Sequence, residues 1–126
     1  MSIPERNQVC FEVGVAGVTF EGRQDILARL YDQQAVGHVL VPRLEREPGN
    51  LHDPNAIRVI VASPMVAPSH IGYIPRNLEA KLAPKLDAGE PFEIKSVRII
   101  KGASDRGTVT YGARLYVEAK RAEEVS

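Results

Sequence analysis

The chain has 126 residues, a formal net charge of zero, 44% hydrophobic residues and a single cysteine, Cys10. This length suits one domain, and one cysteine excludes an intrachain disulfide, which favours a reducing compartment such as the cytoplasm. No apolar run approaches the roughly 18 residues of a membrane span, and the polar start of the sequence is unlike a secretory signal. A neutral chain is poorly suited to coating nucleic acid, because such binding neutralises many phosphates with basic residues. A pocket for one or two phosphates is compatible with this charge.

The first predicted element is a strand that follows a polar leader at residues 1–8. Residues 9–15 alternate apolar and polar side chains, which is typical of a half-buried strand. The alternation continues at Val18 and Phe20, so we expect the strand to resume after a bulge near Gly17. Phe20 has two interpretations: a core side chain, or an aromatic platform at the rim on which a base stacks.

The chain then changes to a helical period. Residues 22–32 are predicted as a helix that begins at Gly22 and carries one apolar face, formed by Ile26, Leu27, Leu30 and Tyr31. Residues 36–46 are extended and β-branched, which predicts a strand. Pro42 places this strand at an edge or a bulge, because proline has no N–H for a ladder. Residues 56–62 are predicted as the next strand.

The following segment is predicted to contain little strand and a second helix. Residues 63–69 are interpreted as a surface loop and residues 70–74 as a very short strand. Residues 75–89 form a helix with Pro75 at its first position, and Pro84 is expected to kink or split it.

Two strands complete the predicted fold. Residues 92–100 form a strand with a bulge near Ser96, residues 104–107 turn the chain, and residues 109–117 alternate cleanly. Residues 119–126 are a polar tail. The chain is therefore expected to be mainly β with two helices, in the α+β class, as a strongly curved, bulged sheet or partly open barrel of about six strands.

The stretch REPGNLHDPNAI, which begins at Arg46, holds more chemistry than a turn requires. One interpretation is structural: Asp53 forms a turn by accepting a backbone N–H two residues on. The other is functional: Asn50, His52 and Asp53 project into one pocket, where an amide, an imidazole and a carboxylate can read a sugar hydroxyl or a base edge.

Arg76 lies in the first turn of the second predicted helix, where acidic residues are usual. No Ser, Thr or Asp precedes Pro75 as a cap, so free backbone N–H groups beside an arginine predict an anion site. Tyr73 adds a flat ring and a hydroxyl. The alternative is a solvated arginine at a frayed helix end.

The sequence offers little for catalysis. His38, His52 and His70 are the only histidines, and they form neither HExxH nor an i, i+4 pair. The segment GASDRG lacks the ending of a phosphate-binding loop, and no GxSxG occurs. We therefore expect no enzyme activity, no metal and no cofactor.

Three segments together resemble the HIRAN domain, a family found at the N-terminus of helicase-like transcription factors and as free-standing bacterial proteins. They are VGVAGVTFEGRQDIL, LEREPGNLHDPNAIRVI and HIGYIPRNLEAKLAPKLDAG, and the resemblance covers residues 9–118. It implies an OB-like β-barrel and, as in the better understood eukaryotic members, binding of a single-stranded DNA 3′ end.

The resemblance also implies roles for individual residues. Asn50 and Asp53 match polar residues that contact the terminal sugar and its 3′-hydroxyl, and Phe20 is close to an aromatic that stacks on a base. His52 stands where a tyrosine is typical, and Tyr73 stands where a histidine contacts the backbone.

Basic residues complete this implied site. Arg76 matches a lysine that holds a phosphate, whereas an arginine before the stacking aromatic is replaced by Thr19 or Val18. Arg23, Arg43 and Arg46 are the candidates to supply that missing contact.

The first hypothesis is a non-catalytic module that binds single-stranded DNA or DNA 3′ ends, in DNA repair or replication-fork processing, with a DNA-processing protein as partner. The carboxylate of Asp53 would accept a terminal hydroxyl and repel a terminal phosphate. A second hypothesis is a protein-interaction domain that binds a peptide or partner subunit. The edge strand near Pro42 would be its binding surface. A third, less favoured, is a small metal-dependent nuclease.

Overall fold

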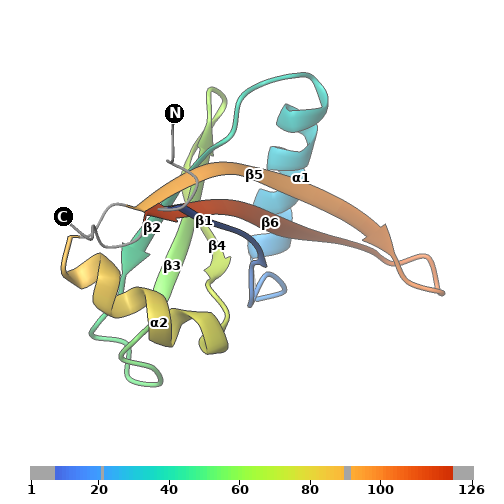
Figure 1. Ribbon diagram of the computed structural model, residues 1–126. Coiled ribbons are helices and arrows are strands. Elements are labelled where there is room, and N and C mark those ends of the chain that lie inside the picture. The colour runs from blue at the N-terminus through green and yellow to red at the C-terminus, as the bar shows by residue number, and fades with distance from the viewer. Residues whose placement is uncertain (1–7, 21, 90–91, 121–126) are drawn as a thin grey trace, which may run out of the picture.

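The computed structural model describes residues 8–20, 22–89 and 92–120, and its strands form two three-stranded antiparallel sheets (Figure 1). The first sheet has the order β1 (Gln8–Gly14), β6 (Val109–Lys120), β5 (Phe92–Ala103). The second has the order β2 (Val41–Arg46), β3 (Ile57–Ser63), β4 (Val66–Tyr73). Two helices, α1 (Arg23–Ala35) and α2 (Arg76–Asp87), complete the order of elements that the sequence predicted.

The core forms where the apolar faces of both sheets meet α1 and α2. Alternation along β3 buries Ile57, Val59 and Val61 completely, and the same period in β6 buries Leu115 and Val117. Helix α1 buries Leu27 and Leu30 from the apolar face that its period predicted, and helix α2 buries Leu82 and Ala83. The mainly β fold with two helices is thus confirmed.

The two sheets are joined at one corner by a two-bond bridge between Ala16 and Tyr73. The N–H of Ala16 donates to the carbonyl of Tyr73 at 2.7 Å, and the N–H of Tyr73 donates back at 2.8 Å. Gly72 permits this approach, because a Cβ there would collide with the carbonyl oxygen of Ala16. β2 and β5 approach each other elsewhere, but among the described strands the pairing does not close. The closed OB-like barrel is therefore not confirmed.

The first strand does not resume after Gly17, contrary to the prediction. Gly17 adopts a positive φ of 72°, and the N–H of Phe20 donates to its carbonyl at 3.3 Å, so this segment turns instead. The side chain of Phe20 is 65% exposed, which makes the core interpretation wrong. The turn directs the chain into α1, which begins after Gly22 as predicted.

Two further element boundaries differ from the prediction. Helix α1 continues to Ala35, and the strand expected from residue 36 begins only at Val41. The predicted loop at residues 63–69 is wrong, because β3 and β4 are joined by a tight turn at Pro64 and Met65. β4 is an edge strand of its sheet, so it tolerates Pro68, which lacks a donor.

Helix α2 begins one residue later than predicted, with Pro75 as its N-cap. It runs without a break through Pro84, which lies in the last turn, so the predicted split is wrong. Gly89, with a φ of 72°, ends the helix as its N–H donates to the carbonyl of Leu86. Within the described parts of the chain, no helix has the length and apolar character to cross a membrane.

The β5–β6 hairpin projects beyond the rest of the molecule (Figure 1). Its predicted bulge near Ser96 and its turn at residues 104–107 are both confirmed. Two side-chain amides of α1 hold its base: Gln34 exchanges two hydrogen bonds with the backbone of Ile99, and Gln24 does so with Tyr111. Residues 1–7 of the leader and 121–126 of the tail lie outside the described residues, whereas Gln8 and Lys120 pair in the first sheet.

Candidate functional site

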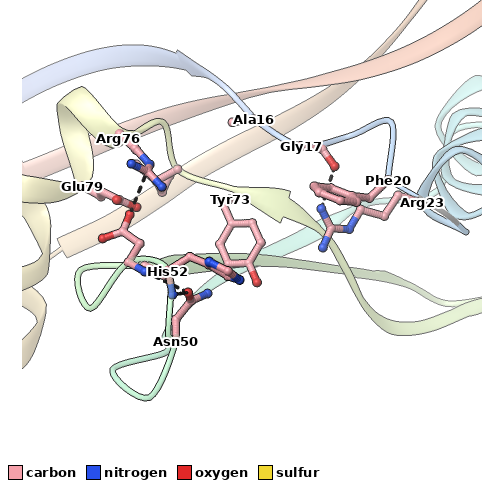
Figure 2. Close-up of a pocket in the computed structure, with 12 residues that line it drawn as sticks. Ala16, Gly17, Phe20, Arg23, Asn50, His52, Tyr73, Arg76 and Glu79 are labelled. Atoms are coloured by element: carbon pink, nitrogen blue, oxygen red, sulfur yellow. Dashed lines mark hydrogen bonds and ion pairs between the residues drawn. The ribbon is translucent and has the colours of Figure 1, made fainter.

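A pocket of about 420 Å³ opens where the corner between the sheets meets the start of α2 (Figure 2). Its walls come from three segments far apart in the sequence: the turn after β1, the β2–β3 loop, and the end of β4 with the first turn of α2. It is lined by Ala16, Gly17, Phe20, Arg23, Asn50, His52, Asp53, Ala56, Tyr73, Ile74, Arg76 and Glu79.

Seven of the nine residues that the sequence suggested for the site line this one pocket: Phe20, Arg23, Asn50, His52, Asp53, Tyr73 and Arg76. Arg43 and Arg46 are outside its lining. Arg43 is an exposed residue of β2 whose guanidinium lies 3.6 Å from the carboxylate of Glu45. The DNA-binding role of each residue stays a prediction, because shared placement in a pocket is not evidence of a ligand.

Arg46 organises the loop that carries the site. Its guanidinium donates to the carbonyls of Ala56 at 2.7 Å and Pro54 at 3.0 Å, and forms a two-pronged contact with the carboxylate of Asp87 in α2. The arginine therefore ties the β2–β3 loop, residues 47–56, to the end of α2. Its contacts are structural and leave little of it to meet a ligand.

Asn50 is also occupied within the loop. Its amide oxygen accepts the N–H groups of His52 at 2.8 Å and Asp53 at 3.0 Å, and its amide nitrogen donates to Glu47 at 2.8 Å. Both ends of the amide are thus engaged, so Asn50 shapes the floor of the pocket. The neighbouring ring of His52 is exposed.

Asp53 forms the predicted turn and also lines the pocket. One carboxylate oxygen accepts the N–H of Asn55 at 2.9 Å, which is the predicted turn. The other oxygen lies 3.8 Å from Nε of Arg76, and the side chain is 17% exposed. The turn fixes the carboxylate while leaving one oxygen toward the pocket.

The first turn of α2 supplies a cation and backbone N–H groups to the end of the pocket that also holds the carboxylates of Asp53 and Glu79. Pro75 gives no side-chain cap, and the N–H groups of the first helical residues have no intrahelical acceptor. Arg76 is 78% exposed at this end of the helix dipole, so an arginine and free amides share one position. Binding of an anion at this position stays a prediction.

An aromatic end faces this charged end across the pocket (Figure 2). Arg23, the first residue of α1, donates to the carbonyl of Gly17 at 2.6 Å. Its guanidinium carbon lies 4.9 Å from the ring centroid of Phe20 and 5.4 Å from that of Tyr73. These contacts hold the exposed ring of Phe20 at the rim, as expected of a stacking platform.

Glu47 links the β2–β3 loop to β4 through its carboxylate. One carboxylate oxygen accepts both the Tyr73 hydroxyl at 2.9 Å and the Asn50 amide at 2.8 Å. The hydrogen bond from Asn50, then that from Tyr73 and the charge of Arg58, lower the pKa of Glu47 against the opposing effect of burial. Burial, followed by the bond to this carboxylate, raises the pKa of Tyr73.

His70 lies beside this network, with its ring edge-on to Tyr73 at 4.8 Å between centroids. The Nε2 atom lies 2.9 Å from the carbonyl of Gly72, a distance at which it donates a hydrogen bond. Burial, followed by the positive charges of Arg23 and Arg58, lowers the pKa of His70.

Sequence reasoning missed two acidic residues of this region, Glu47 and Glu79. Glu79 is 3% exposed and lines the pocket. Its spacing of three residues from Arg76 is a signal that both lie on one helix face. The tertiary burial itself has no sequence signature.

Metal binding finds no support in the described part of the chain, where no group of three or more His, Cys, Asp or Glu is arranged to hold an ion.

Comparison with known proteins gives one match: the family model described as the HIRAN domain matches residues 8–120. No curated protein and no solved structure matches the chain.

Proposed function

The chain belongs to the HIRAN domain family, and on that premise we propose that it is a non-catalytic module that binds single-stranded DNA at a 3′-hydroxyl end. Family membership supports a role in binding nucleic acid. The observation that carries the finer proposal is the division of one pocket into an aromatic end and a charged end (Figure 2).

Each end of the pocket suits one part of a terminal nucleotide. The exposed ring of Phe20, backed by Arg23, is a platform for the last base. Arg76 and the start of α2 suit the phosphate that precedes the last sugar. The second oxygen of Asp53, which lies 3.8 Å from Nε of Arg76, then accepts the 3′-hydroxyl.

The carboxylate of Asp53 also accounts for end selection. A 3′-phosphate would bring two negative charges against a carboxylate that is only 17% exposed, where screening by water is reduced. This mechanism needs one or two basic groups at a single point. It is therefore compatible with a chain of zero net charge.

Fluorescence anisotropy with matched oligonucleotides tests the proposal. One strand ends in a 3′-hydroxyl, a second carries a 3′-phosphate, and a third carries its phosphate at the 5′ end. We expect micromolar binding of the first and third, weaker binding of the second, and a general loss in Arg76→Ala. Equal affinity of the wild type for 3′-hydroxyl and 3′-phosphate ends would contradict the proposal.

The variant Asp53→Asn sharpens this test, because it keeps the size of the side chain and removes its charge. It should bind 3′-hydroxyl ends more weakly and tolerate a 3′-phosphate better than the wild type does. The proposed setting of this activity is DNA repair or replication-fork processing in the cytoplasm, beside a DNA-processing partner protein.

A further inference from the structure

Glu79 is a buried carboxylate that the proposed function does not use. It lies in the first turn of α2, one helical turn beyond Arg76, and is 3% exposed. It lines the pocket, yet its side chain makes no hydrogen bond or ion pair with any residue that the structure describes. Burying an unpaired carboxylate is unfavourable, so this group is suited to receive a donor from a ligand.

The oxygens of Glu79 are accessible from the pocket. Among the described residues, Arg58 Nε is the one fully enclosed side-chain polar atom that lacks a hydrogen-bond partner. Glu79 has no partner among the described residues and its oxygens are not in that class, so we infer that they keep some contact with the pocket that Glu79 lines. Two other polar side chains of the pocket are already engaged: Tyr73 donates to Glu47, and Arg23 donates to Gly17.

The position of Glu79 identifies the part of the ligand it would meet. Figure 2 shows Glu79 beside Arg76, at the end of the pocket opposite Phe20 and Arg23. If the base stacks on Phe20, the sugar and its hydroxyls occupy the end that holds Asp53 and Glu79. A carboxylate at that end meets sugar donors rather than the edge of the base.

We propose that Glu79 reads the 2′ position of the terminal sugar, so that the pocket prefers a single-stranded 3′ end whose last nucleotide is a ribonucleotide. This inference rests on the proposed function, in which Asp53 accepts the 3′-hydroxyl. The neighbouring donor on a ribose is the 2′-hydroxyl, and a deoxyribose offers only C–H there. A deoxy end leaves the carboxylate of Glu79 without a partner.

The expected preference for a ribose end follows from the 2′-hydroxyl that deoxyribose lacks. A site built to bind a hydroxyl discriminates against the analogue that lacks it, because its own buried polar group is then unpaired. Since the oxygens of Glu79 keep some contact with the pocket, water partly compensates them. We therefore expect a preference of about tenfold, in the range of one hydrogen bond to a charged group.

Anisotropy titrations with a DNA oligonucleotide that differs only in its last sugar test the inference. The last nucleotide is deoxyribose, ribose or 2′-O-methylribose, each with a free 3′-hydroxyl. The wild type should bind the ribose end about tenfold more tightly than the deoxyribose end. In Glu79→Gln and Glu79→Ala the ratio of the ribose-end affinity to the deoxyribose-end affinity should fall toward one.

Asp25→Asn is the matched control, because Asp25 is the exposed acidic residue in the first turn of the other helix. It should retain the ribose preference of the wild type. Changing the terminal base while keeping its sugar should not alter the ratio. A ratio that follows the base would overturn the inference, because Glu79 would then read the base edge.

Titrations of the terminal sugar and of the 3′-phosphate together separate the role of Glu79 from the proposed function. Equal binding of ribose and deoxyribose ends, with a retained preference for 3′-hydroxyl over 3′-phosphate, would overturn the role of Glu79 alone. Loss of discrimination against the 3′-phosphate in the wild type would overturn both.

Denaturant unfolding of the ligand-free protein distinguishes a recognition role of Glu79 from a structural role. If the carboxylate of Glu79 is unpaired until a ligand donates to it, Glu79→Gln should unfold at the same or a higher denaturant concentration than the wild type. A lower midpoint would show that the carboxylate supports the fold, and would contradict the inference.

Discussion

Two hairpin connections of this chain use similar turn-forming residues and do different things. The β5–β6 turn at residues 104–108 is bonded within itself: the N–H of Ser104 donates to Thr108 at 2.9 Å, and that of Gly107 donates to Ser104 at 2.8 Å. The Ser104 hydroxyl accepts the N–H groups of Arg106 and Thr108. Each of these residues is exposed, so the turn reverses the chain without engaging other elements.

The β2–β3 loop is instead connected to three other parts of the molecule. Arg46 and Asp87 join its base to the end of α2, and Glu47 joins it to Tyr73 on β4. Asp53 faces Arg76 at the start of α2. Contacts to distant elements, more than turn-forming composition, therefore distinguish the loop that lines the pocket.

The largest effect should come from Arg46→Ala. Its loss leaves the carbonyls of Pro54 and Ala56 and the carboxylate of Asp87 without their shared donor. We expect the free energy of unfolding to fall by about 2–3 kcal/mol and binding of 3′ ends to weaken as the loop loosens. Denaturant unfolding followed by anisotropy measures both.

Arg43→Ala is the control on the same strand. Arg43 is 58% exposed and contacts one carboxylate at 3.6 Å, so its loss should change stability by no more than about 0.5 kcal/mol. If Arg43→Ala and Arg46→Ala lowered the free energy of unfolding equally, the role of Arg46 in holding the β2–β3 loop would be contradicted. A selective loss of binding in Arg43→Ala would identify Arg43 as a phosphate contact.

Tyr73→Phe should have a smaller effect. It removes the hydroxyl that donates to Glu47 at 2.9 Å and keeps the ring against Arg23. We expect a loss of about 1 kcal/mol in the free energy of unfolding, from thermal or chemical unfolding. Tyr116→Phe, at an exposed position on β6, should be neutral, and a comparable loss there would contradict the role of the Glu47 network.

The pH dependence of stability tests the same network through His70, which is surrounded by Arg23, Arg58 and Glu47. Because the pKa of His70 is lowered in the folded state, the unfolded chain binds a proton first as pH falls below about 6.5. Stability from this group is therefore complete above that pH and is lost on acidification.

We expect the melting temperature to fall as pH decreases below about 6.5, and to fall less in His70→Gln. Glu47, whose pKa is also lowered, adds a further loss at more acidic pH. A variant at His70 that follows the wild-type pH profile throughout would contradict this assignment.

The smallest effect is expected in the self-contained turn. Arg106→Ala removes an exposed cation from residues 104–108 and should change stability by less than about 0.5 kcal/mol and leave 3′-end binding unchanged. Arg76→Ala, also an exposed arginine, should weaken binding without a large loss of stability. Weaker binding in Arg106→Ala would show that the β5–β6 arm takes part in recognition.

Local patterns predicted much of this fold, because they report on local physics. The helical period identified Leu27 and Leu30 as residues of a buried face, and the sequence also predicted the bulge near Ser96. Patterns failed where tertiary context decided. Pro68 indicated a loop, but an edge strand accommodates it, and β-branched Val36 and Val39 are 70% and 71% exposed outside any strand.

The candidate site was likewise predicted only in part. Residue chemistry and the family resemblance selected seven residues that the fold brings to one pocket. They did not reveal that Asn50 is engaged by Glu47, that Arg46 braces the loop, or that Glu79 is buried. Each of these facts depends on the meeting of segments distant in sequence, which a single sequence does not encode locally.

The most direct test of the central claim compares the two connections within one experiment. Amide chemical shifts of the ¹⁵N-labelled protein are followed while a short single-stranded oligonucleotide with a 3′-hydroxyl is added. We predict that the largest shifts occur at Gly17, at residues 50–53 and at Arg76, while residues 104–107 remain unchanged. Shifts centred on the β5–β6 turn, with the pocket unaffected at saturation, would contradict the account.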